Sequence, residues 1–218
     1  MGKEHLETAR RDGKGAVLWI GRFSFAALAE KMAFAGEGYE VHHVSRPQHG
    51  YSATRFGMKY LNPIRTRTEY RHAAGRILIN SERPADSMNE ARKLLKANKF
   101  VSIAGGTTEG QVLVLTQFAG YRMRFTAGPP RLAKLAGAPL LPVFVVREPS
   151  TGVIRIVVDR PIDLDRGGSR DEMIARAVQE FADRHQPFVK THPHQWRDWK
   201  LLMRRKRKKA DLVSRPPA

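Results

Sequence analysis

The sequence predicts a single α/β domain, a sandwich in which helices flank a mainly parallel central sheet. A chain of 218 residues with 41% hydrophobic content can bury one core of ordinary size. Short apolar runs alternate with amphipathic segments along most of its length, which is the pattern of layered α/β folds. In addition, "AVLWI", a helical segment and "YEVHHV" follow one another within about thirty residues, and such a unit places its two strands parallel.

The chain divides into a polar segment (1–14), the α/β domain (15–203) and a basic tail (204–218) that we expect to be disordered. The run "AVLWI" at 16–20 is continuously apolar, which is typical of a strand covered on both faces. Ser24 is the expected N-cap of the helix that follows. Helical spacing puts Phe25, Leu28 and Met32 on one face of that helix. In "YEVHHV", His42 and His43 should point to opposite faces of the sheet, which argues against a shared metal.

The second half of the chain continues the alternation. A helix is predicted from about 86 to 97, opened by the capping box of Ser87 and Glu90. "FVSIA" and "VLVL" read as strands on either side of the loop "GGTTEG", and "AGPPRLAKLAG" as a helix that ends at Gly137. "PLLPVFVV" and "GVIRIVV" are expected to pair. Ser169 and Glu172 form the capping box of a last helix. Its apolar stripe consists of Met173, Ala177, Val178 and Phe181.

The net positive charge of the chain indicates which classes of binding partner it attracts. The chain has 39 Lys and Arg against 21 Asp and Glu, a net charge of +18, so its field attracts anionic membranes and nucleic acids. With no cysteine it has neither disulfides nor thiol chemistry. No apolar run reaches the roughly 18 residues that a membrane span requires, so we do not expect the chain to cross a membrane by itself.

Four segments, in this order, resemble the lysophospholipid acyltransferase superfamily and, within it, the bacterial lipid A biosynthesis (lauroyl/myristoyl) acyltransferases. They are "VHHVSRP" (41–47), "ARKLLKANKFVSIAGGTTEG" (91–110), "PPRLAKLAGAPLLPVFVVR" (129–147) and "HPHQWRDWKLLMRRK" (192–206). The resemblance extends over about residues 15 to 205. The family also carries a membrane-anchoring N-terminal helix, to which we find no counterpart before the first strand. Both a natural short form and a fragment of a longer chain remain open.

The resemblance implies a catalytic pair after the first strand. In the family a histidine acts as general base, and an Asp or Glu five residues later orients it. Here the corresponding positions hold Arg22 and Ala27. A guanidinium stays protonated and cannot act as that base. None of the eight histidines is followed five residues later by Asp or Glu, so we expect the catalytic motif to be absent. Glu109, in the loop "GGTTEG", is the candidate replacement base; a turn residue that only forms hydrogen bonds is the alternative.

Binding sites are predicted from the basic residues. Arginines near the first two strands are candidates for holding the phosphate of a lipid or of an acyl carrier, and a solvated basic face is the alternative. They are Arg22, Arg46, Arg55, Arg65 and Arg67. A second set near the C-terminus is expected to contact a membrane, with tryptophans packed against the core as the alternative. It comprises Trp196, Trp199, Arg204, Arg205 and Lys206. No residue grouping has the spacing of metal ligands, so no metal is expected.

Together these observations predict a homologue of the lipid A and lysophospholipid acyltransferases, peripheral to the cytoplasmic face of the inner membrane. It would transfer, or would formerly have transferred, a fatty acyl group to a hydroxyl of a glycolipid or lysolipid. The acyl donor would be an acyl carrier protein or coenzyme A thioester, with no further cofactor. The expected partners are an anionic membrane lipid or glycolipid and acyl carrier protein. A catalytically inactive lipid-binding pseudoenzyme and a basic nucleic-acid-binding protein are the alternatives, and the oligomeric state is left open.

Overall fold

A computed structural model describes residues 2–46, 50, 52, 54–79, 82–106, 112–165 and 167–199. Its centre is a six-stranded sheet with the strand order β3-β2-β4-β1-β7-β8. Neighbouring strands are parallel from β3 through β7, and β8 is antiparallel to β7. This arrangement confirms the predicted fold class. The strands are β1 (Ala16–Ile20), β2 (Val41–Ser45), β3 (Gly75–Leu78), β4 (Phe100–Ala104), β7 (Leu140–Arg147) and β8 (Ile154–Val158).

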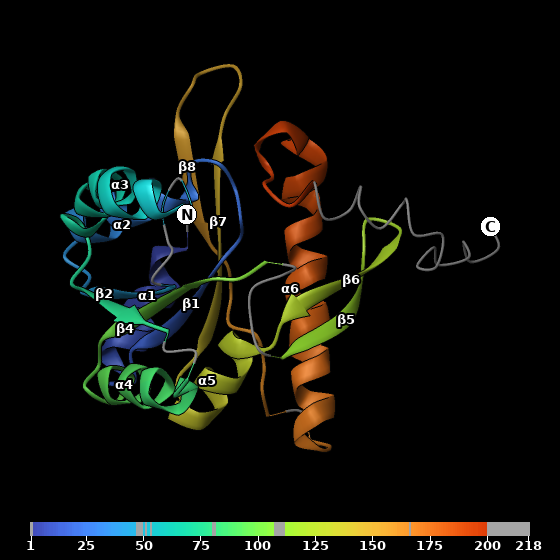
Figure 1. Ribbon diagram of the computed structural model, residues 1–218. Helices are drawn as coiled ribbons and strands as arrows, with labels where there is room; N and C mark the ends of the chain where they lie inside the picture. The colour runs from blue at the N-terminus through green and yellow to red at the C-terminus, as the bar shows by residue number, and fades with distance from the viewer. Residues whose placement is uncertain are drawn as a thin grey trace.

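Helices cover the sheet, with α2 and α3 on one side and α4 and α5 on the other (Figure 1). A two-stranded hairpin, β5 (Leu113–Phe118) and β6 (Tyr121–Thr126), packs against the long helix α6. The polar N-terminal segment forms α1, which packs against β1 and β8. The helices are α1 (Lys3–Arg11), α2 (Ala26–Gly36), α3 (Asn62–Tyr70), α4 (Pro84–Lys96), α5 (Gly128–Ala136) and α6 (Arg170–Thr191), with short helices η1 (Gly57–Leu61) and η2 (Pro193–Gln195).

Several local predictions are confirmed. Every residue of β1 is buried, and β7 is buried up to its last residue, as continuous apolar runs predict for strands covered on both faces. Helix α5 ends at Gly137, whose φ of 66° is a left-handed conformation that glycine adopts without steric cost. The capping box of Ser169 and Glu172 is formed at the start of α6. The predicted apolar stripe of α6 is buried.

Two predicted helix starts are wrong. Ser24 does not cap α2: its hydroxyl donates a hydrogen bond to the carbonyl of Gln195, 3.0 Å away, because the C-terminal segment packs against this turn. Ser87 lies inside α4, which begins three residues earlier at Pro84. The fixed φ of proline suits the first turn of a helix, so the start at Pro84 replaces the capping box that the spacing predicts.

The apolar face that the spacing predicts for α2 is only partly buried. Met32 is 49% exposed, whereas Glu30 and Lys31 are each only 1% exposed. Helix α2 packs against α3 and β2, and both elements offer polar partners to these two charged residues. The predicted helix is present, but it is turned so that a charged pair faces the interior.

None of the helices in the described residues combines the length and the apolar content needed to cross a bilayer.

Candidate functional site

Three neighbouring parallel strands end side by side at one edge of the sheet. Arg46 follows β2 directly, Gly105 and Gly106 follow β4, and Arg22 lies two residues after β1. Ligands of open α/β sheets bind at the carboxyl ends of the strands. The fold therefore brings two predicted site residues, Arg22 and Arg46, to the edge where binding is expected.

Arg22 is held by the C-terminal segment. Its guanidinium Nη1 lies 3.4 Å from Oδ1 of Asp198, and the backbone N–H of Arg197 donates to the Arg22 carbonyl at 3.0 Å. The Asp198 side chain is only 4% exposed, while that of Arg22 is 20% exposed. One side of the guanidinium is thus fixed by a buried carboxylate, and part of the side chain still reaches solvent.

Gly106 permits this ion pair to lie against the end of β4. A Cβ atom at Gly106 would lie 2.3 Å from Cδ of Arg22 and 2.5 Å from Oδ2 of Asp198, well inside van der Waals contact. At Gly105 a Cβ atom would lie 2.2 Å from Nε1 of Trp19. Gly106 is therefore required by the close packing around Arg22 and Asp198, and Gly105 by the approach of Trp19.

Ala27 lies in the first turn of α2. Its carbonyl oxygen accepts a hydrogen bond of 2.6 Å from Nζ of Lys31, one turn further along the helix. The side chain of Ala27 offers no group that could orient a base. In the described residues, the turn after β1 therefore contains an arginine paired with an aspartate and no histidine with a carboxylate.

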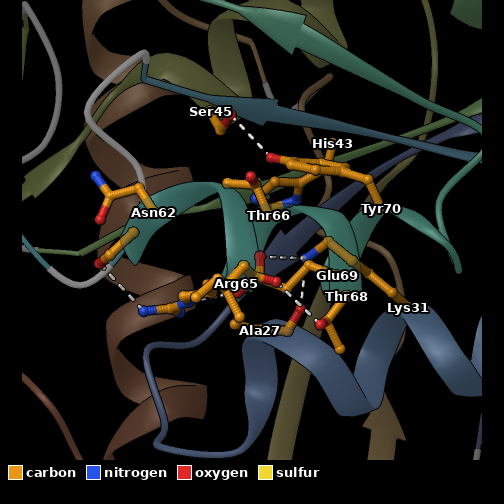
Figure 2. A network of polar contacts seen from close by, with 12 residues as sticks. Ala27, Lys31, His43, Ser45, Asn62, Arg65, Thr66, Thr68, Glu69 and Tyr70 are labelled. Carbon is orange, nitrogen blue, oxygen red and sulfur yellow. Dashed lines mark hydrogen bonds and ion pairs between the residues drawn. The ribbon is translucent and has the colours of Figure 1, made fainter. Parts of the chain in front are cut away.

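A largely buried group of charges lies between α2 and α3, and we call it the α2–α3 charge cluster: Glu30, Lys31, Arg65 and Glu69. Figure 2 shows three of its members, Lys31, Arg65 and Glu69. Nζ of Lys31 lies 3.1 Å from Oε1 of Glu30 and 3.8 Å from Oε2 of Glu69. Nε of Arg65 donates to Oε1 of Glu69 at 2.5 Å. Two carboxylates are thus balanced by two cations. This cluster was not predicted from the sequence, although two adjacent charged residues in the apolar stretch "FAALAEKMAFA" are a signal for it.

His43 and Ser102 lie beside this cluster, on adjacent strands. The hydroxyl of Ser102 is 2.8 Å from Nδ1 of His43, and Oε1 of Glu30 is 3.7 Å from the same nitrogen. In a Ser–His–carboxylate triad the hydroxyl and the carboxylate contact opposite nitrogens of the ring. Because both approach one nitrogen here, and Ser102 is completely buried, the arrangement is not that of a nucleophilic site.

Burial raises the pKa of the Glu30 carboxyl, and the adjacent Lys31 ammonium partly opposes this shift. Oε2 of Glu30 has no hydrogen-bond partner in the described part of the chain. The protonation state of Glu30 therefore depends on Lys31, its closest cation.

A second basic group stands at the end of β2. Arg76 donates from Nε to the hydroxyl of Ser45 at 2.7 Å and from Nη2 to the carbonyl of Arg46 at 2.8 Å. Its guanidinium lies 5.0 Å from the centre of the Tyr70 ring, and the Tyr70 hydroxyl is 3.0 Å from that of Ser45. Arg76 thereby fixes the backbone from which the exposed Arg46 side chain projects. The sequence analysis did not single out Arg76.

A comparison with known protein families shows to which family the chain belongs. The model of the bacterial lipid A biosynthesis acyltransferase family matches residues 1–207. The chain belongs to this family. No curated protein matches it.

The remaining predicted binding residues of this family member occupy different surroundings. Arg55 and Arg67 are exposed on the helical segment that contains η1 and α3. Arg65 is 15% exposed and bonds internally, to Glu69 and to the carbonyl of Gly50. Glu109, the candidate base, lies outside the described residues.

The C-terminal tryptophans of the acyltransferase homologue pack inward to different degrees. Trp196 is only 3% exposed, and its ring contacts those of Phe118 and His185. This burial fits the alternative of a tryptophan packed against the core, and contact of Trp196 with a membrane stays a prediction. Trp199 is half-buried and donates its indole N–H to the carbonyl of Pro193. The predicted membrane-contact residues Arg204, Arg205 and Lys206 lie outside the described residues.

In the part of the chain that the structure describes, no three His, Asp or Glu residues are grouped as metal ligands.

Proposed function

We propose that this member of the lipid A acyltransferase family binds a phosphorylated glycolipid or lysolipid at the carboxyl edge of its sheet without the family's histidine-based chemistry. The observation that carries the proposal is Arg22, which occupies the turn after β1 and is fixed by Asp198. A guanidinium has five N–H donors, so one engaged by a carboxylate can still present donors to a phosphate.

Arg46 supplies a second cation at the same edge. It is exposed, it follows β2, and only β4 separates β2 from β1 in the sheet. Its backbone is held by Arg76, which reduces the conformational freedom lost on binding. Two arginines that project from the ends of nearby strands suit a phosphate monoester or diester better than a neutral lipid head group.

Neither the arginine in the turn after β1 nor the histidine on β2 is suited to act as a general base. The guanidinium of Arg22 has only hydrogen-bond donors and no acceptor, and His43 is 4% exposed with its Nδ1 hydrogen-bonded to Ser102. The loss of a positioned general base costs typically 10²- to 10⁴-fold in rate. We therefore propose that binding, and not turnover, is the function of the site.

A second candidate is slow acyl transfer with Glu109 as base. Glu109 is the third residue after Gly106, and Gly106 contacts both Arg22 and Asp198. The acyl group would pass from a thioester of acyl carrier protein or coenzyme A to the lipid hydroxyl. The carboxylate would take the hydroxyl proton as the oxygen attacks the thioester carbonyl, and would then give it to the departing thiolate, which leaves as the thiol.

One assay separates the two candidates. The purified full-length protein is incubated with radiolabelled acyl carrier protein thioester and a pool of phosphorylated glycolipid and lysolipid, and both bound lipid and acyl transfer are measured. The variants are Glu109→Gln and the double substitution Arg22→His/Ala27→Glu. The proposal predicts lipid binding without transfer in the unmodified protein. Transfer that is lost in Glu109→Gln would establish the second candidate instead.

Binding of the phosphorylated lipid is tested by a separate variant with a matched control. Arg46→Ala is expected to weaken binding of the phosphorylated lipid about tenfold, the effect of one charge-assisted contact. Arg124→Ala, which removes an exposed arginine from β6, is the matched control and should leave binding unchanged. Equal losses in both variants would mean that only overall charge matters, and an absence of lipid binding would refute the proposal.

A further inference from the structure

An unusual share of the exposed apolar surface lies on one helical segment. Phe56, Tyr60 and Ile64 are 65%, 53% and 62% exposed, and their spacing of four residues places them in one row. The ring centres of Phe56 and Tyr60 are 5.1 Å apart. Met58 and Leu61, each 40% exposed, flank this row. We call these five residues of η1, α3 and the preceding turn the α3 apolar face.

The α3 apolar face contains a large share of the exposed apolar side chains of the molecule. Of the twelve large apolar side chains exposed in the described residues, five fall between residues 56 and 64. Single exposed apolar residues need no explanation, but a contiguous group marks an interaction surface. The opposite side of the helix is already occupied, because Glu69 and Asn62 are buried there.

The charges around the face are of one sign. Between residues 41 and 81 the sequence contains a single acidic residue, Glu69, and this carboxylate is buried against Arg65 and Lys31. Within residues 54–74, around the face, the exposed charged side chains are therefore all basic: Arg55, Lys59, Arg67 and Arg71. Nζ of Lys59 lies 5.2 Å from the centre of the Tyr60 ring. Aromatic and aliphatic side chains bordered by cations are the composition of helices that lie in the surface of an anionic bilayer.

We propose that the α3 apolar face inserts into the interface of an anionic lipid bilayer, with the surrounding basic residues on the lipid phosphates. Helix α3 also carries Tyr70, which contacts Ser45 at the end of β2, beside Arg46. Docking through this face would bring lipid head groups close to the edge where the proposed phosphate site lies. The inference goes beyond the proposed function and does not depend on it, because the face does not include the arginines of that site.

The test uses the absence of cysteine in the chain. Full-length protein with the single substitution Ile64→Cys is labelled with a polarity-sensitive fluorophore. Val153→Cys, on the β7–β8 turn, is the matched control because Val153 is 60% exposed, close to the 62% of Ile64. Vesicles of phosphatidylcholine with and without phosphatidylglycerol are then added. We expect the emission of the label at position 64 to shift to the blue only when the vesicles contain phosphatidylglycerol. The emission of the label at position 153 should not shift with either kind of vesicle.

A second measurement gives the strength of binding. Phe56→Ser/Ile64→Ser is expected to lower the partition coefficient for anionic vesicles at least about tenfold, because two apolar side chains no longer leave water. Val153→Ser/Ile154→Ser should leave it unchanged. Circular dichroism confirms that each variant is folded; should Phe56→Ser/Ile64→Ser unfold, the labelled Ile64→Cys protein still tests the proposal.

Three outcomes would overturn the proposal. Vesicle binding with no shift at position 64 would place the contact elsewhere, for example in the C-terminal basic segment. A blue shift at position 64 that depends on protein concentration without lipid would identify a second copy of the chain as the occupant. In a competition experiment, duplex DNA is added at the same phosphate concentration as the vesicles. If the DNA displaces the vesicles while the blue shift at position 64 persists, nucleic acid is the preferred partner.

Discussion

Replacing Lys31 by methionine removes the cation that lies between two buried carboxylates while keeping most of the aliphatic stem. Nζ of Lys31 is 3.1 Å from Glu30 and 3.8 Å from Glu69, and the side chain is 1% exposed. At an effective dielectric constant of about 20, these separations correspond to attractions of roughly 4 to 5 kcal/mol each. The cost of removing the ammonium from water offsets part of this gain. Breaking a buried ion pair by removal of one partner lowers the free energy of unfolding by about 3–5 kcal/mol, which we expect here.

The loss should depend on pH. Burial already raises the pKa of the Glu30 carboxyl, and removal of the Lys31 ammonium raises that pKa further. A carboxyl with a higher pKa in the folded protein than in the unfolded chain binds more protons when folded. Its contribution is therefore present below the unfolded pKa and is lost as the pH rises through the folded pKa. Lys31→Met should thus destabilise the protein more at pH 8 than at pH 5.

Urea unfolding followed by circular dichroism at both pH values measures this effect. Lys134→Met is the control, since Lys134 forms an exposed ion pair with Asp165 and surface substitutions change stability by about 0.5 kcal/mol or less. Adding Glu30→Gln to Lys31→Met should restore about 1–2 kcal/mol, because the uncompensated carboxylate is gone. If Lys31→Met costs less than about 1 kcal/mol at both pH values, Lys31 does not neutralise the cluster as described.

Three further changes test other parts of the structure. Gly106→Ala should displace Arg22 and Asp198, lower stability by about 1–3 kcal/mol in urea unfolding and weaken binding of the phosphorylated lipid; unchanged binding would show that this packing is not needed. Burial lowers the pKa of His185 to about 3, so between pH 6.5 and 3 the unfolded chain binds more protons and stability falls with the pH. Neither ring nitrogen of His185 has a hydrogen-bond partner in the described residues, so His185→Phe should flatten the pH dependence of the unfolding temperature over this range without loss of stability at pH 7. Ser169→Ala should cost about 1 kcal/mol through loss of the α6 capping box, and no change in the urea midpoint would contradict that role.

Much of the order of strands and helices was predictable because local patterns carry that information, although α1, α3, β3 and β6 were not predicted. The continuous apolar run of β1, the prolines and Gly137 around α5 and the capping box of α6 are signals within a few neighbouring residues. The family could likewise be predicted, since its segments appear in order along the chain, and the family match over residues 1–207 confirms it.

Helix α2 shows where local patterns fail. Its 3.6-residue period predicts a helix, and the same period fits more than one choice of buried face. The face that is buried contains Glu30 and Lys31 because Glu69, 38 residues later in the chain, and His43 on β2 provide their partners. The prediction that Ser24 caps α2 failed because its hydrogen-bond partner is also distant in sequence. The hydroxyl of Ser24 donates to the carbonyl of Gln195, which is 171 residues away.

The sequence by itself determined that Arg22 and Ala27 occupy the turn where the resemblance predicts the family's base and acid. It also determined the excess of positive charge. Only the tertiary structure decided that Arg22 is paired with Asp198, that Gly106 makes room for this pair and that basic and apolar side chains share one face of η1 and α3. Residue identities fix which chemistry is available, but ion pairs, close approaches and exposed faces depend on contacts between segments distant in the chain. Such contacts arise only when the sheet and its helices pack together.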